Sequence, residues 1–420
     1  MEQEIYVAVD LGNSQMRMMA ASKDEEGKLN ILGIETAKPK DETIQNGIIK
    51  NSSEVAWSIN DLAIKLTNKL NNGQDINGLY ISVNGRTLRT IRGKVQRTFE
   101  SPTEITRNDL NSLKQELYSK KIEGKDIYGV TNEEYVIDGD IVRNPEGMLC
   151  RNIEANYLIV YARNDIRISI DKCFDRIAQN KMDEIPAPMA IAAAVTSADD
   201  KQLGCAVLNF GAATTTVAVY QDNYLRHMAI IPFGSNHITS DLKYLNLSFD
   251  KAEKIKCQLG TPIANEQSAL TTHTIKGKAG EEDRKIKSSD MISIIEARLS
   301  EIVTLCMNEI KRSGYIDRLQ AGIIVTGGGS KMKDFIPFMR QKTQMDVRFG
   351  SHTDLLSAST PAEYQATEYS LLVGLLHLAD KPCTSTPQPD NKPIRPKTKE
   401  KGWGSKILNL FNGDENSIED

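Results

Sequence analysis

Two stretches of this sequence share one form, although they lie in different halves of the chain. They are "VAVDLGNSQMRMMA" at residues 7–20 and "VLNFGAATTTVAVY" at residues 207–220. In both, apolar residues alternate into a short turn around a glycine and alternate out again, which predicts a β-hairpin. A single glycine turn needs no functional explanation, because glycine adopts positive φ without strain. A form that occurs twice needs one explanation for both turns.

Both turns carry backbone N–H groups that their small or hydroxyl-bearing side chains leave unshielded. Such groups can approach an anion closely, so the two turns suggest a phosphate ligand. Asp10, two residues before Gly12, supports this interpretation, because a carboxylate beside a phosphate suits a Mg²⁺ ion between them. A third glycine turn, at 327–329, is predicted between a buried strand and a helix, where backbone amides can also hold a phosphate or let a nucleoside approach.

The length, composition and net charge of the chain argue against several other classes of protein. Its 420 residues are enough for two to four domains. The net charge of −4 provides no global attraction to nucleic acid. Six cysteines and five histidines are dispersed without a CxxC pair, which argues against a disulfide framework and a zinc site. No secretory signal and no apolar run of transmembrane length is found, so we expect a protein of the cytosol.

The remaining pattern predicts an α/β protein with an insertion and a tail. Apolar residues have helical spacing at 54–72, at 166–182 and, over the longest stretch, at 289–312. Residues 86–165 differ from the segments around them in their predicted secondary structure, which consists of several strands and one helix. We interpret them as an inserted α+β subdomain. After Asp380 the chain is rich in proline and almost devoid of apolar residues, which predicts a disordered tether.

Two hairpins followed by a strand, a triple glycine and a helix resemble the pattern of the actin/Hsp70/hexokinase ATPases. In that superfamily two lobes each offer a phosphate hairpin to a nucleotide in the cleft between them. More closely, the chain resembles the FtsA family of bacterial cell-division actins from end to end. The similar stretches are "YVAVDLGNSQMR", "LGCAVLNFGAATTTVAVY", "LRHMAIIPFGSNHITSDL", "AEKIK", "IIEARLSEI" and "AGIIVTGGGSKM". The insertion also lies where this family carries its 1C subdomain.

The resemblance implies an actin-like fold of two lobes and a division of the chain into subdomains. Subdomain 1A is expected at 1–85, 166–204 and 359–380, subdomain 1C at 86–165, subdomain 2A at 205–244 and 319–358, subdomain 2B at 245–318, a disordered linker at 381–400, a membrane-targeting amphipathic helix at 401–412 and an acidic tail at 413–420.

The resemblance also implies a site for ATP and Mg²⁺, in which Asp10 holds the metal through water. The expected nucleotide-binding residues are Asp10, Gly12, Asn13, Ser14, Gln15, Arg17, Asn209, Gly211, Ala212, Ala213, Thr214, Thr215, Gly234, Ser235, Glu253, Lys256, Gly327, Gly328 and Gly329. For Glu253 and Lys256, in "AEKIK", the plain alternative is a solvated helix face. The position of this segment between the second hairpin and the triple glycine favours the border of the ribose and base.

The chain departs from the family pattern at Asn209, where the second hairpin usually begins with an aspartate. An amide is a poor ligand for Mg²⁺ and cannot act as a base. The stretch "PAPMAIAAAVT" at 186–196, where hydrolytic relatives place a water-orienting polar side chain, contains no glutamine or glutamate. General-base catalysis needs a group within reach of the attacking water. We therefore expect no catalytic residue, and at most weak ATPase activity.

The last predicted element lies at 401–412 and has one apolar face. On a helical wheel, Trp403, Ile407, Leu410 and Phe411 fall within about 100°, with Leu408 a little beyond, and Lys401 and Lys406 flank this face. The alternative is a tail helix that packs on its own core. A proline-rich tether before it and the aromatic and lysine side chains favour the headgroup region of an anionic membrane. Proteins of the FtsA family end in such a helix.

The long helix at 289–312 is expected to carry a partner surface. Its outer row includes Arg298, Glu301, Asn308 and Lys311, for which a solvated face is the plain alternative. In the FtsA family this subdomain receives the C-terminal peptide of the tubulin-like protein FtsZ. An acidic or mixed peptide could pair with the two basic residues of the row.

Together these features predict an ATP-binding actin homologue that polymerises at the cytoplasmic face of the inner membrane, at the division site, and anchors the FtsZ ring there. Other division proteins are expected at the 86–165 insertion. The nucleotide would act as a conformational and polymerisation switch. One alternative is a small-molecule kinase on the same fold, against which Asn209 argues. A second is a pilus-assembly actin resembling PilM, against which the tail helix argues.

Overall fold

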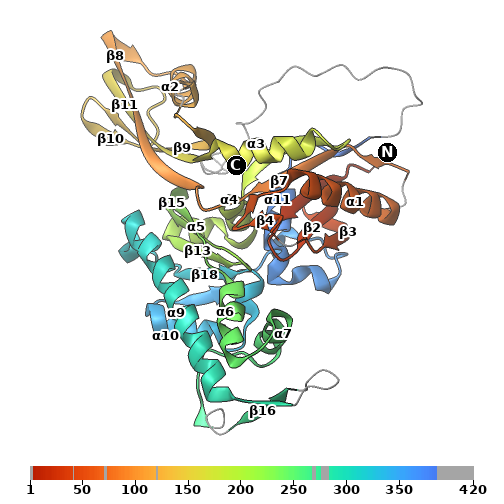
Figure 1. Ribbon diagram of the computed structural model, residues 1–420. Coiled ribbons are helices and arrows are strands. Elements are labelled where there is room, and N and C mark those ends of the chain that lie inside the picture. The colour runs from red at the N-terminus through yellow and green to blue at the C-terminus, as the bar shows by residue number, and fades with distance from the viewer. Residues whose placement is uncertain are drawn as a thin grey trace.

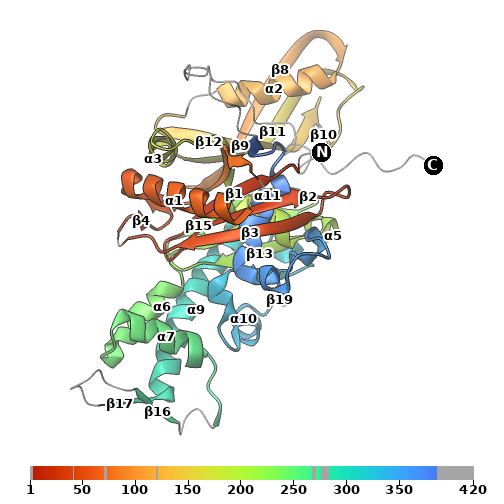
Figure 2. The same ribbon diagram turned by 90° about the vertical axis from the view of Figure 1, so that its right-hand side faces the viewer.

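The structure of this chain is a computed structural model that describes residues 3–40, 42–70, 73–119, 122–266, 271–275 and 283–385. Two large sheets organise it, one with the strand order β12-β7-β1-β2-β3 and one with the order β10-β9-β11-β8-β15-β14-β13-β18-β19. Figure 1 shows the first sheet with α1 on one side of the molecule and the second sheet extending from the upper insertion into the lower lobe. The view turned by 90° places the insertion and β16 at opposite ends of the molecule (Figure 2).

The first lobe is built around a hairpin that the alternating sequence predicted. β1 pairs with β2 antiparallel, with Leu11 opposite Met16, so residues 12–15 form the turn, as expected. β1 also pairs with β7 in parallel, and its side chains are almost all buried. The elements of this lobe are β1 (Tyr6–Leu11), β2 (Met16–Lys23), β3 (Leu29–Ala37), β4 (Ile44–Gln45), β5 (Ile48–Ile49), α1 (Ser52–Leu70), β6 (Asp75–Ile76), β7 (Gly78–Val83), α3 (Asn164–Phe174), β12 (Asn180–Pro186), α4 (Ala187–Val195), α11 (Ser370–Leu378) and β20 (Thr384–Ser385).

The second lobe repeats this plan. β13 pairs antiparallel with β14, with Phe210 opposite Thr215, and in parallel with β18, so the second predicted hairpin is also confirmed. The long amphipathic helix that the sequence predicted is α9. The elements are α5 (Ala198–Leu203), β13 (Cys205–Phe210), β14 (Thr215–Gln221), β15 (Tyr224–Ile231), α6 (Ser235–Leu242), α7 (Phe249–Leu259), β16 (Thr272–Ile275), β17 (Arg284–Lys287), α9 (Ser288–Ser313), β18 (Ile323–Thr326), α10 (Phe335–Thr343) and β19 (Val347–Phe349).

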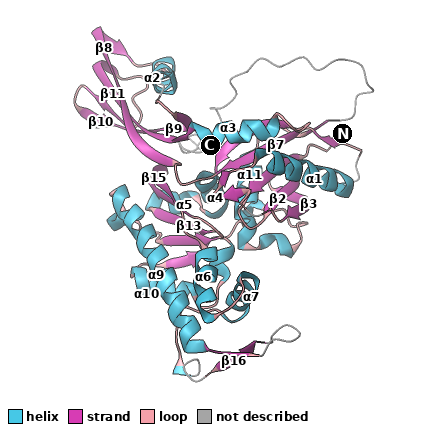
Figure 3. Cartoon of the chain, in the orientation of Figure 1, coloured by secondary structure: helices cyan, strands magenta, loops and turns pink. Residues whose placement is uncertain are grey.

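The inserted segment is an α+β unit, as predicted, with a hydrophobic core of its own. Figure 3 shows its strands with one helix, α2, lying against them. Leu113 and Leu117 on α2 are buried against the sheet. The elements are β8 (Arg89–Glu104), α2 (Arg107–Ser119), β9 (Lys125–Ile137), β10 (Asp140–Val142) and β11 (Leu149–Arg163).

Two helices of small and aliphatic residues lie between the sheets. α4, from the stretch "APMAIAAAV", contacts β7 and β12 in one sheet and β13 and β14 in the other, and α11 packs on α4. A Cβ on Gly374 of α11 would overlap the carbonyl oxygen of Ala190, so only glycine permits this approach of the two helices. The hydrophobic core of the first lobe consequently continues into the second, through Val207, Ala218 and Ile324.

Two expectations from the sequence need correction. The helix predicted at 166–182 ends at Phe174 in α3, and residues 180–186 form β12 instead. β12 pairs in parallel with β7, a long-range partner that local spacing does not reveal. Residues 381–385, which were predicted to belong to the disordered tether, are part of the described fold. Cys383 is buried, its N–H donates to the carbonyl of Ile5 at 2.7 Å, and β20 pairs with β6.

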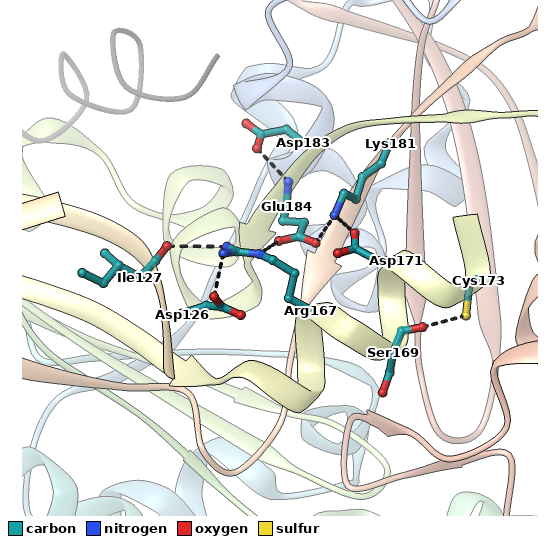
Figure 4. A network of polar contacts seen from close by, with 9 residues as sticks. All are labelled: Asp126, Ile127, Arg167, Ser169, Asp171, Cys173, Lys181, Asp183 and Glu184. Carbon is teal, nitrogen blue, oxygen red and sulfur yellow. Dashed lines mark hydrogen bonds and ion pairs between the residues drawn. The ribbon is translucent and has the colours of Figure 1, made fainter. Parts of the chain in front are cut away.

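A network of ion pairs joins the insertion to the first lobe (Figure 4). Nε of Arg167 on α3 donates to Glu184 of β12 at 2.7 Å, and its Nη1 lies 3.3 Å from Asp126 of β9. Lys181 pairs with both Glu184 and Asp171. The side chain of Glu184 is only 7% exposed, so its charge depends on these two cations. The network holds α3, β9 and β12 together.

Asp183 lies beside this network, and burial raises the pKa of its carboxyl to about 7, with the Asp380 and Glu184 carboxylates adding to the effect. A pKa raised in the folded state means that stability is lost as the pH rises from about 4 to about 7. We expect Asp183→Asn to be more stable than the parent protein at pH 8, and the difference to vanish near pH 4. Urea unfolding across this range measures it. Asp140→Asn, on exposed β10, controls for the lost charge; equal gains in both variants would contradict the prediction.

Candidate functional site

The first glycine turn places a carboxylate at the carboxyl end of β1. Asp10 lies opposite Arg17 in the hairpin, and Ser82 of β7 donates its hydroxyl to Asp10 Oδ1 at 3.3 Å. Burial raises the pKa of Asp10, while Arg17 and Ser82 oppose that shift. A Cβ on Gly12 would lie 2.5 Å from the carbonyl oxygen of Gln15, so the turn closes only around glycine. A partly desolvated carboxylate of this kind fits a nearby cation.

The side chains of this turn have different roles. Asn13 donates from Nδ2 to the carbonyl of Ile44 at 2.7 Å and accepts from the N–H of Gly47 at 2.9 Å. It therefore anchors the turn to a neighbouring loop, which the sequence did not indicate. Ser14 and Gln15 are exposed, and Arg17 donates to Gln15 Oε1 at 2.7 Å. The exposed part of the turn is the part available to a ligand.

The second glycine turn packs on the start of α6. The N–H of Gly211 donates to the carbonyl of Thr214 at 2.9 Å and closes the turn. Ser235 and Asn236 donate their N–H groups to the carbonyls of Gly211 and Ala212 at 3.0 and 2.8 Å. A Cβ on Gly234 would lie 2.6 Å from each of these carbonyl oxygens. The turn 211–214 and the segment 234–235 thus form one unit.

Thr215 belongs to the strand rather than to the exposed turn. It is fully buried, and its hydroxyl donates to the carbonyl of Phe233 at 2.8 Å. Its side chain therefore supports the turn from inside, and the contact of residue 215 with a nucleotide stays a prediction.

The triple glycine lies against the second hairpin. Gly327 has φ +90°, and a Cβ there would overlap Asn209 Oδ1 and lie 2.6 Å from the carbonyl oxygen of Phe210. A Cβ on Gly329 would lie 2.9 Å from the same carbonyl, whereas one on Gly328 meets nothing within 4 Å. Because β18 pairs in parallel with β13, both glycine segments leave the same edge of the sheet. Ligands of α/β sheets bind outside such carboxyl ends.

These contacts predict different effects at two adjacent glycines. We expect Gly327→Ala to lower the free energy of unfolding by at least about 1–3 kcal/mol, because the residue is held at positive φ and its new methyl group overlaps Asn209. Gly328→Ala is the matched control, and we expect it to leave stability nearly unchanged. Thermal and urea unfolding of the two variants measure the difference. Similar losses in both would show that the close approach to Asn209 is not what requires glycine.

Glu253 and Lys256 meet at the same place as Gly234 and Ser235. Lys256 is buried, and its Nζ donates to the Ser235 carbonyl, the Thr239 hydroxyl and Glu253 Oε2 at 3.2, 2.8 and 2.6 Å. Thr239 also donates to Glu253. Because Lys256 is buried and hydrogen-bonded in this way, the alternative that it lies on a solvated face of its helix is excluded. Its contacts fix α7 on α6, beside the second glycine turn.

Two supporting residues of the site were missed by the sequence analysis. Ser82 touches Asp10 only because β7 pairs with β1, with Ile81 opposite Val9. Thr239 joins Glu253 and Lys256 from the neighbouring helix α6. No local signal distinguishes either residue. Within the described ranges, no three His, Cys, Asp or Glu side chains cluster as a metal site.

The predicted partner surface on α9 is only partly available. Arg298 donates from Nε and Nη2 to the two carboxylate oxygens of Asp241 on α6, at 2.6 and 3.0 Å, and its Nη1 contacts Glu301. Arg298 therefore joins α9 to α6 within the chain. Asn308 and Lys311 are exposed. The binding of a partner peptide to this surface stays a prediction.

The predicted tail helix, with Trp403, Ile407, Leu408, Leu410, Phe411, Lys401 and Lys406, lies outside the described residues. In the part of the chain that is described, no helix combines the length and the apolar character needed to span a bilayer.

Comparisons with solved structures support the fold. The structure resembles the "PilM-PilN type IV pilus biogenesis complex" with a TM-score of 0.59 and 13% sequence identity, over 88% of this chain and 97% of that chain. It also resembles MreB5 of Spiroplasma citri bound to ADP, with a TM-score of 0.51 and 12% identity, over 88% and 94% of the two chains. At these identities the likeness establishes the actin-like fold alone, as the sequence predicted.

Comparisons with sequences identify the family. The family model "Cell division protein FtsA" matches residues 206–374, and "SHS2 domain inserted in FTSA" matches residues 85–161. The cell division protein FtsA of Porphyromonas gingivalis is 27% identical over 386 residues, 90% of this chain and 79% of the relative. That of Neisseria meningitidis is 26% identical over 99% of this chain and 100% of the relative. The chain therefore belongs to the FtsA family of actin-like cell-division proteins.

Proposed function

We propose that this protein binds ATP with Mg²⁺ between its lobes, polymerises, and anchors the FtsZ ring to the cytoplasmic face of the cell membrane. The observation that carries the nucleotide part is the convergence of three segments in the second lobe. Gly234 approaches the turn 211–214 so closely that a side chain is excluded there, and Gly327 and Gly329 approach Phe210, the residue just before that turn, in the same way. The first lobe offers the Gly12 turn with Asp10 at the matching end of β1.

In this proposal the two turns contact different parts of the nucleotide and its metal ion. Backbone N–H groups at the exposed parts of both turns would bind the phosphates, and Arg17 would add positive charge beside the first turn. Asp10 would orient the water shell of Mg²⁺, which neutralises phosphate charge when it is bound. The bare face of the triple glycine at Gly328 would admit the nucleoside, because no side chain stands there.

The two lobes would respond to the nucleotide as a switch. The turns belong to different sheets, and α4 and α11 lie between those sheets. A ligand that contacts both turns would favour one angle between the lobes. In a polymer whose contacts involved both lobes of each subunit, that angle would determine the affinity of subunits for each other.

Slow or absent hydrolysis follows from the chemistry of Asn209 and of α4. Asn209 is partly buried beside Gly327, and α4 is made of apolar residues. We expect Asn209→Asp to raise ATP turnover, because a carboxylate adds a negative charge that can hold the metal. Phosphate release measures this. Asn51→Asp, which keeps a capping oxygen at the start of α1, is the matched control. Unchanged turnover in Asn209→Asp would mean that this residue does not limit hydrolysis.

The alternatives make different predictions in one experiment. We expect the full chain with ATP and Mg²⁺ to form filaments on a monolayer of anionic lipid viewed by electron microscopy, and FtsZ to be recruited to them. A pilus-assembly actin of the PilM kind would neither bind the monolayer nor recruit FtsZ. A small-molecule kinase would need a catalytic carboxylate in the cleft facing its substrate, and the replacement of aspartate by Asn209 argues against this alternative. Absence of filaments and of lipid binding would refute the proposed function.

A further inference from the structure

A cavity lies between the insertion and the second lobe, and none of its lining residues belongs to the glycine turns. Its volume is about 730 Å³, and its walls come from β8, β11, β15 and the chain around the C-terminal end of α9. In Figure 1 that end of α9 lies beside β15, below the strands of the insertion. The proposed nucleotide function does not use this cavity.

The cavity opens where two strands separate. In the described pairing, β15 and β8 meet at a single position, Ala229 opposite Arg89. One residue further, the N–H of Met228 donates to the hydroxyl of Thr90 at 3.1 Å, so a side chain takes the place of the next ladder bond. From there β8 continues along β11, and β15 continues along β14. The space between them is a wedge bounded by two strand edges, and such edges are templates for an added strand.

The wedge is strongly basic although the chain as a whole has a net charge of −4. The lining residues, all of them described, include Arg92, Arg226, Arg312 and Arg318 and no carboxylate. The side chain of Arg226 is 9% exposed and stacks over Tyr315 at 5.1 Å from the ring centroid. Arg318 lies over the same ring at 5.7 Å. Stacking limits the freedom of these guanidinium groups before any ligand binds.

Two carboxylates behind the lining are already paired. Glu309, 8% exposed, lies 2.9 Å from His227 and 2.6 Å from Arg312, and Arg89 approaches it at 3.6 Å. Asp222 pairs with Arg226 at 3.5 Å and with Arg143 of the insertion at 3.3 Å. These pairs fix the wall of the wedge and the position of the insertion.

We propose that this wedge binds an acidic peptide of a partner protein in extended conformation, added as a strand between β8 and β15. Backbone hydrogen bonds to a strand edge would supply affinity, and side chains at alternate positions would face one wall. Carboxylates on that face would form charge-assisted hydrogen bonds with the arginines. Ile91, which is 48% exposed on β8, offers an apolar contact beside them.

The strand edges favour a peptide over a phosphorylated small molecule. Phosphates would engage the guanidinium groups but would leave the edges of β8 and β15 unused. A peptide uses both features, and about five residues span the stretch from Tyr224 to Met228 at about 3.3 Å per residue. Occupation of the wedge would also fix the insertion against the second lobe, because its two walls belong to these two parts of the chain.

The test uses the full chain and fluorescence anisotropy of a labelled peptide, Glu-Thr-Glu-Val-Glu-Thr. We expect saturable binding that weakens with salt, as screening of the ion pairs requires. The same peptide with glutamine for glutamate, or with N-methyl groups on alternate amides, is expected to bind at least tenfold more weakly. Arg92→Glu with Arg318→Glu, both exposed, is expected to cause a similar loss. Arg107→Glu with Arg151→Glu, exposed elsewhere on the insertion, is the matched control and should bind as the parent does.

Hydrogen exchange of backbone amides is a second measurement, because attraction between charges alone would not change the exchange rates at the strand edges. We expect the peptide to slow exchange at residues 90–92 and 226–228. Equal binding of the N-methylated peptide, with displacement by tripolyphosphate and no slowing of exchange, would overturn the proposal in favour of a phosphorylated ligand. Tighter binding after removal of residues 413–420, with competition by a peptide of that sequence, would overturn it in favour of the chain's own acidic end.

Discussion

Asp10→Ala is expected to weaken the binding of Mg²⁺-ATP by about ten- to hundredfold. Interactions with charged groups contribute about 1.5–3 kcal/mol each, which corresponds to that range of affinity. Asp10 stands at the end of β1 next to the Gly12 turn, and burial raises the pKa of its carboxyl. A bound cation would offset this cost of keeping the carboxylate charged. Isothermal titration with a non-hydrolysable ATP analogue, with Mg²⁺ and with EDTA, measures the effect.

The Asp10 experiment can separate folding from binding. Asp10→Asn keeps the size of the side chain and an oxygen that can accept from Ser82. We expect Asp10→Asn to fold at least as well as the parent at pH 8 and still to lose the Mg²⁺-dependent part of the affinity. Because the pKa of Asp10 is raised, that part should decline as the pH falls and the carboxyl takes up its proton. Equal affinity of parent and variants in Mg²⁺ would remove Asp10 from the metal site.

Trp403→Glu combined with Phe411→Glu is expected to abolish sedimentation of the protein with anionic vesicles. Each large apolar side chain contributes roughly 2 kcal/mol on burial, so losing two lowers the affinity of one copy about a thousandfold. The measurement is co-sedimentation with vesicles of phosphatidylglycerol and phosphatidylethanolamine, with ATP binding measured in parallel and expected to be unchanged. Filaments would amplify weak binding of single copies through effective concentration.

The matched control for the tail places substitutions on the opposite face of the same predicted helix. Ser405→Glu with Asn409→Glu adds the same two charges away from the apolar face, and we expect most of the binding to remain. Persistent binding of the Trp403 and Phe411 variant would contradict the membrane interpretation. If the helix instead packed on the core of the protein, deleting residues 401–412 would lower the melting temperature, whereas we expect no change.

Local pattern was sufficient for the elements whose partners are close in sequence. Both hairpins, at Gly12 and at Gly211, form as the alternation of apolar residues predicted, because a two-stranded antiparallel unit pairs with itself. The long helix α9 and the α+β insertion follow for the same reason. β12 was missed, because its pairing with β7 joins residues about a hundred positions apart and overrides the helical spacing after Phe174.

The candidate site likewise contains features that the local sequence predicted and features that depend on distant segments. The sequence indicated the glycine segments and Asp10, because bare turns and a neighbouring carboxylate are visible in a few residues. It did not indicate that Asn13 and the Thr215 hydroxyl are held by the backbone, nor that Lys256 is buried against Ser235 and Thr239. Those roles depend on which atoms of other segments come within about 3 Å, and spacing along the chain carries no such information.

The sequence by itself determined the two hairpins and the family, because these depend on neighbours along the chain, and it supplied the residues that are proposed to contact a phosphate. The tertiary structure decided which glycines must be glycine, as at Gly327 beside Asn209, and which charges meet, as in the wedge of Arg92, Arg226 and Arg318. The physical reason is that van der Waals overlap and ion pairing act over a few ångströms in space. The pairing of β13 with β18 brings Gly327 to Asn209, whereas the pairing of β8 with β15 and the packing of α9 bring the arginines of the wedge together.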